Sequence, residues 1–191
     1  MRYRKILGAI ILFFVLASIG FAEDFDLQYF VAKASSKENG LSKQDRTELL
    51  NRMEGVMDQA QRINKSLIEA IQGGGMTVEY QEGKFWMSKL EEDRGSIETG
   101  IQQLKLLREK PTHLIASVKL YKSLRDLSSN FNAYNNTSLF SAFVGDLAPE
   151  MELWADPVFY RLHLLPLARS KDMETEPPKK EKPPIPKEKK P

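Results

Sequence analysis

Two long stretches of the chain carry mainly apolar residues at alternating spacings of four and three positions, and this periodicity constrains the fold more than any other feature of the sequence. The first series is Leu49, Met53, Val56, Ala60, Ile63, Leu67 and Ala70. The second series is His113, Ser117, Leu120, Leu124, Leu127, Phe131 and Tyr134. Because this spacing gathers side chains on one face of an α-helix, we expect two long amphipathic helices whose apolar faces must be buried against partners.

Start and stop signals bound the first of these helices. Ser42 followed three positions later by Asp45 is typical of a capping box. The glycines at 73–75 should end the helix, because glycine readily adopts the left-handed cap conformation. The helix between these signals would hold roughly thirty residues. A short helix over 24–36 should precede it and end at the turn pair Asn39-Gly40.

The middle of the chain is ambiguous before it becomes helical again. Residues 76–87 contain Glu82-Gly83 between two short β-prone runs, a pattern that allows a hairpin as well as a loop. Helical spacing resumes at Trp86 and continues until Pro111 closes the segment. We therefore expect a third long helix between these two residues.

The last helical region should start near Pro149 and break at Asp156-Pro157. Aspartate suits a helix N-cap and proline suits the first helical position. The apolar side then continues until Pro166. This segment would form a shorter helix in two pieces.

These segments predict an all-α fold, an up-and-down helical bundle of about four main helices. An extended coiled-coil dimer is the main structural alternative, since both periodic series would also suit a coiled coil. Each series stops after three heptads and is followed by a turn. Folding back within one chain is therefore the favoured interpretation.

The chain begins with the three-part layout of a secretory signal peptide. Arg2, Arg4 and Lys5 are basic, and an apolar run follows over residues 6–19. Gly20 and Ala22 are the small residues that a signal peptidase reads. The apolar run is shorter than the roughly twenty residues of a transmembrane helix. We therefore expect residues 1–22 to be removed, leaving an exported protein, periplasmic or extracellular, with no transmembrane segment. An uncleaved membrane anchor is the alternative.

Charge is distributed unevenly along the chain. The net charge is +2, of which residues 1–22 contribute +3 and residues 177–191 contribute +4, so that residues 23–176 carry −5. A mildly acidic body argues against nucleic-acid binding, which normally needs a basic face. The chain has no cysteine, which excludes disulfides and covalent c-type haem. By length, residues 23–176 form one helical-bundle domain with an apolar core.

The composition changes abruptly at residues 177–191, which contain six prolines and six lysines and only Ile185 as a large apolar residue. Such a segment should be a disordered, Pro/Lys-rich tail with polyproline II character. It would bind a partner groove or an anionic envelope surface. A tail that only improves solubility is the alternative.

The sequence offers little catalytic chemistry. Neither GxSxG nor SxxK occurs, and His113 and His163 stand outside any recognised nucleophile or zinc motif. We expect His113 to be a partly buried residue at a helix start. A haem site pairing either histidine with Met53, Met57 or Met151 is chemically possible, whereas methionines at helical spacing usually fill a core. The sequence therefore assigns no catalytic, cofactor-binding or metal-ligating residue.

Two further groups of residues stand out. Glu91-Glu92-Asp93 is the densest carboxylate cluster. Because consecutive helical residues point in different directions, we interpret this cluster as a solvated face. The main aromatic concentration is Trp86, Trp154, Phe159 and Tyr160. For these side chains core packing is favoured over a ligand cage.

Together these features predict a non-enzymatic exported protein that acts as a binding or interaction module in the cell envelope. Its partner would be another envelope protein, or an anionic envelope surface contacted by residues 177–191, and not a nucleic acid. One alternative is a bundle that carries a small apolar ligand or haem. A further alternative is a wall-active hydrolase, whose acid and base would be two carboxyl groups.

Overall fold

The computed structural model describes residues 25–36, 40–76 and 78–175. In chain order its helices are α2 (Leu27–Ser35), α3 (Lys43–Gln72), α4 (Tyr80–Glu109), α5 (Leu114–Asn135), α6 (Ser141–Val144), α7 (Leu147–Leu153), η1 (Trp154–Leu164) and α8 (Leu165–Thr175). Within these ranges no helix is both long and apolar enough to cross a bilayer. The predicted leader, residues 1–22, and the predicted tail, residues 177–191, lie outside the described residues.

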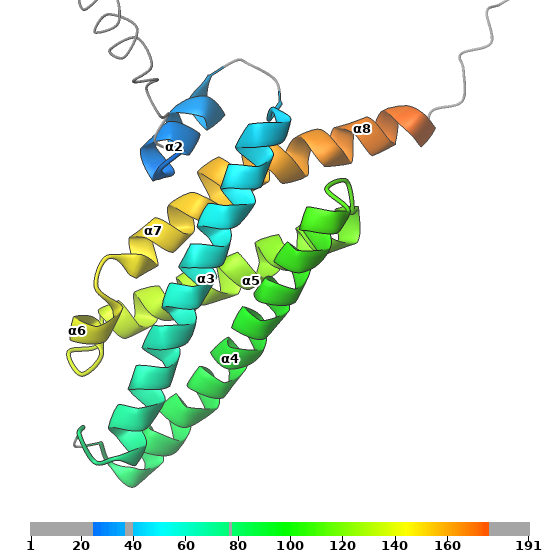
Figure 1. Ribbon diagram of the computed structural model, residues 1–191. Coiled ribbons are helices and arrows are strands. Elements are labelled where there is room, and N and C mark those ends of the chain that lie inside the picture. Colours follow the sequence, from blue (N-terminus) through cyan, green and yellow to red (C-terminus); the bar gives the residue numbers. More distant parts are fainter. Residues whose placement is uncertain (1–24, 37–39, 77, 176–191) are drawn as a thin grey trace, which may run out of the picture.

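Three long helices form the body of the molecule (Figure 1). Helix α3 runs down to the glycine turn, α4 returns beside it, and α5 packs along α4. The chain then passes through α6, and α7, η1 and α8 follow one another as a fourth helical stretch that packs mainly on α5. Helix α2 packs on η1 at one end. This arrangement confirms the predicted helical bundle.

The two periodic series supply most of the core. Leu49 and Met53 in α3 and Leu124 and Phe131 in α5 have no exposed surface. Ile63, midway along α3, is only partly buried and packs against the margin of the core. Burial of each large apolar side chain stabilises the fold by about 2 kcal/mol. The predicted faces are therefore correct, with Ile63 nearer to solvent than its position in the series suggests.

Both ends of α3 form as the sequence predicts. Ser42 Oγ accepts a hydrogen bond from the backbone N–H of Asp45 at 3.0 Å, and the Asp45 carboxylate accepts one from the backbone N–H of Ser42 at 2.9 Å. These two bonds complete the capping box. At the other end Gly73 is the C-cap, and Gly74 takes a φ of +71°, in the left-handed region that favours glycine. The turn sends α4 back beside α3.

The second half of the 76–87 segment is helical, so neither the hairpin nor the loop interpretation is correct there. Gly83 lies in the first turn of α4, where glycine costs about 1 kcal/mol relative to alanine. Tertiary contacts offset this cost. The ring of Trp86 lies 5.8 Å from that of Tyr134 and 4.9 Å from that of Phe140. These edge-to-face contacts hold the start of α4 against the bundle.

The predicted break at Asp156-Pro157 is wrong, because α7 passes directly into η1, an 11-residue π-helical segment, and then into α8. Proline breaks an α-helix because its ring clashes with the carbonyl four residues earlier and it has no N–H. The wider π-helix, with bonds from residue i to i−5, accommodates Pro157. Asp156 is therefore not an N-cap. Its carboxylate accepts a hydrogen bond from Tyr121 Oη at 2.7 Å and pairs with Arg125.

Candidate functional site

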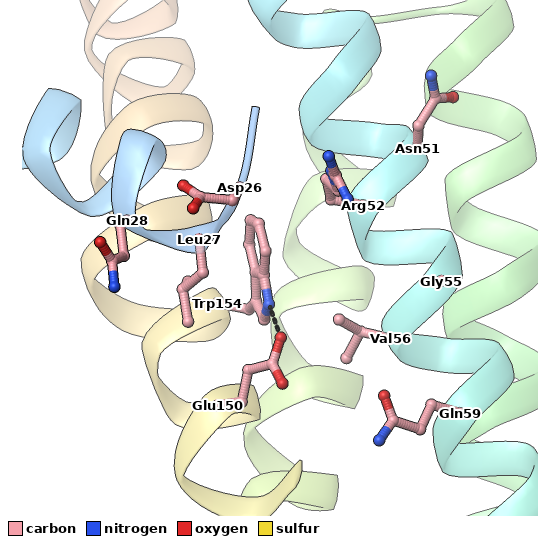
Figure 2. Close-up of a pocket in the computed structure, with 10 residues that line it drawn as sticks. All are labelled: Asp26, Leu27, Gln28, Asn51, Arg52, Gly55, Val56, Gln59, Glu150 and Trp154. Carbon is pink, nitrogen blue, oxygen red and sulfur yellow. Dashed lines mark hydrogen bonds between the residues drawn. The ribbon is translucent and has the colours of Figure 1, made fainter. Parts of the chain in front are cut away.

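A groove lies between α2, α3 and the α7–η1 segment (Figure 2). It is open to solvent and has a volume of about 620 Å³. The residues that line it are Asp26, Leu27, Gln28, Asn51, Arg52, Gly55, Val56, Gln59, Glu150 and Trp154. We call this cleft the α2–α3 groove. Its walls come from segments far apart in sequence, so its shape depends on how α2 and η1 pack.

Trp154 lies at the base of the groove on the η1 side. Its Nε1 donates a hydrogen bond to Glu150 Oε1 at 3.1 Å, the dashed line in Figure 2. The indole ring lies 5.8 Å from the ring of Phe30 in α2, and both side chains are buried. Aromatic pairs of this kind stabilise by about 1 kcal/mol beyond the area that they bury. This pair therefore fixes α2 on η1 and holds the groove in shape.

A buried carboxylate joins α2 to the start of α3. Asp45, which is 4% exposed, accepts a hydrogen bond from Tyr29 Oη at 2.7 Å and pairs with Lys33 Nζ at 2.7 Å. Burial alone would raise the pKa of Asp45, but hydrogen bonds from Lys33, Tyr29 and Ser42 outweigh it and hold this pKa well below its usual range. Asp45 is therefore ionised at neutral pH and ties the two helices together.

The α3 wall of the groove has a gap at Gly55. A Cβ atom built at this position would meet no atom within 4 Å. Asn51 and Gln59 lie one turn before and one turn after it, and residues four apart share a face of a helix. The Asn51 amide is already engaged, because its Oδ1 accepts a hydrogen bond from Arg108 Nη2 at 2.9 Å. The wall therefore presents bare backbone beside the amide of Gln59, which can both donate and accept hydrogen bonds.

The groove carries charges of both signs. Asp26 and Glu150 contribute carboxylates and Arg52 contributes a guanidinium group. Asp26 also caps α2, accepting a hydrogen bond from the backbone N–H of Tyr29 at 2.8 Å. The formal charge of the lining is −1. The groove thus combines a mildly acidic lining with amides and the apolar side chain of Leu27, a mixture suited to recognition of a polar chain.

The two histidines occupy separate places outside this groove. His113 is the N-cap of α5, and its Nδ1 accepts a hydrogen bond from the backbone N–H of Ala116 at 3.0 Å. The prediction of a partly buried residue at a helix start is confirmed. His163 lies in η1, with its ring stacked on Phe159 and its Nε2 3.1 Å from Ser117 Oγ.

The three methionines weighed as haem ligands are core residues. Met53, Met57 and Met151 have no exposed surface and do not line the groove. Met57 packs against Gly100 of α4, where an added Cβ atom would lie 2.6 Å from Met57 Cε. In the part of the chain that the structure describes, no three His, Cys, Asp or Glu side chains converge on a metal position.

The interpretation of Glu91-Glu92-Asp93 as a solvated face is wrong for one of its members. Glu91 and Glu92 are exposed, but Asp93 has no exposed surface. Asp93 follows Leu90 by three positions and precedes Ile97 by four, and both of these are buried. Since residues at such spacings share a face of a helix, Asp93 points inward with them. The helical spacing therefore indicated a buried position for Asp93, although the run of three charged residues favoured a solvated one.

Two donors hold Asp93 between α4 and α5. Tyr134 Oη donates a hydrogen bond to Oδ2, and Asn130 Nδ2 donates one to Oδ1 at 2.6 Å. Burial raises the pKa of Asp93, and the two hydrogen bonds oppose this shift. Burial and the neighbouring carboxylate also raise the pKa of Tyr134. Asp93 and Tyr134 are buried and Asn130 is half-buried, and the cluster fixes how α4 packs on α5.

The aromatic residues singled out in the sequence do not gather in one cage. Trp154 and Phe159 are buried, Trp86 is half-buried, and Tyr160 is exposed on η1. Core packing thus describes the first three. Trp154 additionally lines the groove, a role that the sequence did not indicate.

No known protein family matches this chain, and comparisons with characterised proteins and with solved structures give no significant match. The chemistry of the α2–α3 groove and the sequence features already described are therefore the basis for inferring a function. The groove offers carboxylates, amides and a guanidinium group in one open cleft.

Proposed function

We propose that this protein is a non-enzymatic, exported binding module of the cell envelope, and that it recognises a polypeptide segment of another envelope protein in the α2–α3 groove. The observation that supports this proposal is the α3 wall, where bare backbone at Gly55 lies one helical turn before the amide of Gln59. An amide that donates and accepts at once matches the repeating N–H and C=O groups of an extended chain.

The size and openness of the groove fit such a ligand. Its volume of about 620 Å³ lies within the usual range for binding sites, and it is open along its length rather than enclosed. An extended segment crosses an open groove, whereas a small apolar ligand is usually held in a closed one. The carboxylates of Asp26 and Glu150 against the single guanidinium of Arg52 favour a neutral or basic segment.

Gly55→Leu is the sharpest test, because the new side chain would fill the groove without a clash. Nothing lies within 4 Å of the added Cβ, and leucine is a better helix former than glycine. The variant should therefore fold at least as well as the natural protein. Gly95→Leu is the matched control, since Gly95 is an exposed glycine inside α4 with equally open surroundings.

The partner is to be trapped by a photo-cross-linking residue at Gln59 in intact envelopes, and its affinity then measured with the purified proteins by calorimetry. We expect Gly55→Leu to weaken binding at least tenfold and Gly95→Leu to leave it unchanged. Equal affinities for all three proteins would show that the groove is not the recognition surface.

Export is tested separately, by mass spectrometry of the protein recovered from the envelope and the medium. Residues 1–22 support a mature form beginning at Glu23, because small residues at Gly20 and Ala22 precede an acidic start. Recovery of the intact N-terminus from membranes would replace the exported module with an anchored one. That outcome would leave the groove hypothesis to be decided by the cross-linking experiment.

A further inference from the structure

A cationic side chain with an unsatisfied donor lies at the junction of two further clefts. Arg46, near the start of α3, lines one cleft of about 200 Å³ and another of about 390 Å³. Its Nε is buried and has no hydrogen-bond partner among the described residues. A buried N–H without an acceptor leaves its desolvation uncompensated, so this position is poorly explained by stability alone.

The charge of the two clefts has one sign. Among the described residues no carboxylate lines either cleft, whereas Lys43, Arg46 and Arg108 line the larger one. Arg108 is neutralised by Glu54, whose Oε2 lies 2.6 Å from its Nη2 outside the clefts. No ion pair within the described ranges involves Lys43 or Arg46. Two cations therefore face the clefts without a counter-charge.

His163 closes the smaller cleft on the η1 side. Its side chain is 6% exposed, and Nε2 lies 3.1 Å from Ser117 Oγ. Burial, and to a lesser extent the charge of Arg46, lower the pKa of His163 to about 4. The ring is thus neutral at neutral pH and can serve as a hydrogen-bonding group beside the guanidinium. An anion bound beside the ring would oppose this lowering of the His163 pKa.

The start of α3 adds to the positive potential. Helix dipoles favour anions at an N-terminus, and Gly40 and Leu41 of the preceding turn line the smaller cleft. Asp45 is the acidic residue of this turn, but it pairs with Lys33 on the α2 side and lines neither cleft. Asp45, whose carboxylate caps α3, therefore does not compete with a bound anion for Arg46.

We propose that the two clefts form one anion-binding site centred on Arg46 and that its ligand carries a phosphate group. The guanidinium fork matches phosphate oxygens in a bidentate way. Two uncompensated cations suit a doubly charged anion better than a carboxylate. Apolar walls at Leu50 and Leu162 leave room for the group that bears the phosphate. The ligand is either a small soluble phosphomonoester or a phospholipid whose headgroup is a phosphomonoester.

The first arm of the test is thermal unfolding of the purified protein in inorganic phosphate at constant ionic strength. A ligand that binds only the folded state raises the melting temperature in proportion to the logarithm of its concentration. We expect this rise with phosphate and at least tenfold weaker binding in Arg46→Met. Lys65→Met is the matched control, because Lys65 is an exposed cation near the other end of α3. Its response should equal that of the natural protein.

Arg46→Met removes an unsatisfied buried donor and should melt at the same temperature as the natural protein, or higher, when phosphate is absent. Should this variant fail to fold, Arg46→Lys is the second variant. It keeps the positive charge but removes the bidentate guanidinium donors, and it should still weaken phosphate binding at least tenfold. NMR supplies a second readout. Saturating phosphate should raise the pKa of His163 in the natural protein, because it introduces negative charge beside the ring.

The second arm is sedimentation with vesicles of phosphatidic acid, whose headgroup is a phosphomonoester, and phosphatidylcholine, compared with phosphatidylcholine alone. A shift by inorganic phosphate that depends on Arg46 assigns a soluble ligand. Binding to anionic vesicles that depends on Arg46, without such a shift, assigns a lipid headgroup. The proposal is overturned when neither effect depends on Arg46, including the case in which Arg46→Met and Lys65→Met lose binding equally.

Discussion

Asp45 and Asp93 are buried carboxylates in two regions of the bundle, each bound by a tyrosine hydroxyl, yet their pKa values shift in opposite directions. At the junction of α2 and α3, Asp45 is 4% exposed and its pKa is lowered. Between α4 and α5, Asp93 has no exposed surface and its pKa is raised. Tyr29 and Tyr134 are both hydroxyl donors, so the difference lies in the deeper burial of Asp93 and in the remaining partners.

The remaining partners differ in charge and in number. Asp45 adds a lysine, Lys33, and the capping bonds of Ser42, whereas Asp93 adds only the neutral amide of Asn130. At Asp45 the cation and the hydrogen bonds of Tyr29 and Ser42 together outweigh desolvation, whereas at Asp93 the two neutral donors do not. A buried carboxylate with a cation thus joins elements at neutral pH. A buried carboxylate without a cation specifies which helix faces pack together, at some cost in stability.

The largest expected effect comes from removing the cation. Lys33→Met would leave Asp45 ionised, buried and without a counter-charge, and should lower the free energy of unfolding by about 3 kcal/mol. This is the lower end of the range for buried pairs, because the Lys33 side chain is 20% exposed. Urea unfolding at pH 7 measures the loss. Lys65→Met, at an exposed pair, should change it by less than about 0.5 kcal/mol, and equal losses in both variants would contradict the assignment.

A matched pair of hydroxyl deletions comes next. Tyr134→Phe removes one of two donors from Asp93 and should cost about 2 kcal/mol, as for a hydrogen bond to a charged group. Tyr29→Phe should cost about 1 kcal/mol, because Asp45 keeps Lys33 and the capping bonds. Both variants are compared by urea unfolding. A larger loss for Tyr29→Phe would reverse the ranking of the two regions.

Lowering the pH should change the contributions of Asp45 and Asp93 to the free energy of unfolding in opposite directions. The pKa of Asp45 is lowered on folding, so its contribution is present above the ordinary value of 3.8 and is lost as the pH falls below it. The pKa of Asp93 is raised, so its ionised form destabilises the fold at neutral pH and this penalty disappears as the pH falls toward 3.8. Unfolding free energies between pH 3 and 7 for Asp45→Asn and Asp93→Asn measure both trends. Parallel curves for the two variants would contradict this account.

The smallest expected effect is that of Asp93→Asn at pH 7. The amide removes the buried charge and can still bond Tyr134 and Asn130, so the free energy of unfolding should change by less than about 1 kcal/mol. Calorimetry of the natural protein and the variant checks this. A loss of several kcal/mol would mean that the ionised carboxylate is needed for the α4–α5 contact.

Local patterns predicted much of this fold. The periodic series place Leu49 and Leu124 in the core, and the capping box of Ser42 and Asp45 forms as expected. These features depend on a few neighbouring residues, whose spacing decides which side of a helix is apolar and where the helix starts. The packing partners of each face then follow from the short turns between long helices.

Polar residues inside the apolar stripes were harder to see. Asp93 sits in a run of charges, and Asn64 in α3 is buried, with its Nδ2 donating to the carbonyl of Leu90 at 2.8 Å. Both occupy positions that the helical spacing places on the buried face of the helix. Assigning residues to faces by their position, and not by their hydrophobicity, would have predicted that both side chains are buried. The groove is different, because Gly55 and Trp154 meet only through tertiary packing of α2 on η1. No local pattern encodes that contact.

The α3–α4 hairpin extends past the rest of the bundle at its glycine turn (Figure 1). At this overhang Tyr80 is 75% exposed and Phe85 54% exposed, and the N-cap Glu79 makes no side-chain hydrogen bond. The exposed side chains before Trp86 make few buried contacts, so the tip can open locally while Trp86 and the remaining helices stay packed. Backbone amides near the tip should therefore exchange with deuterium earliest. Insertions, deletions or a label at this tip should therefore leave the surroundings of Gly55 and Arg46 unchanged.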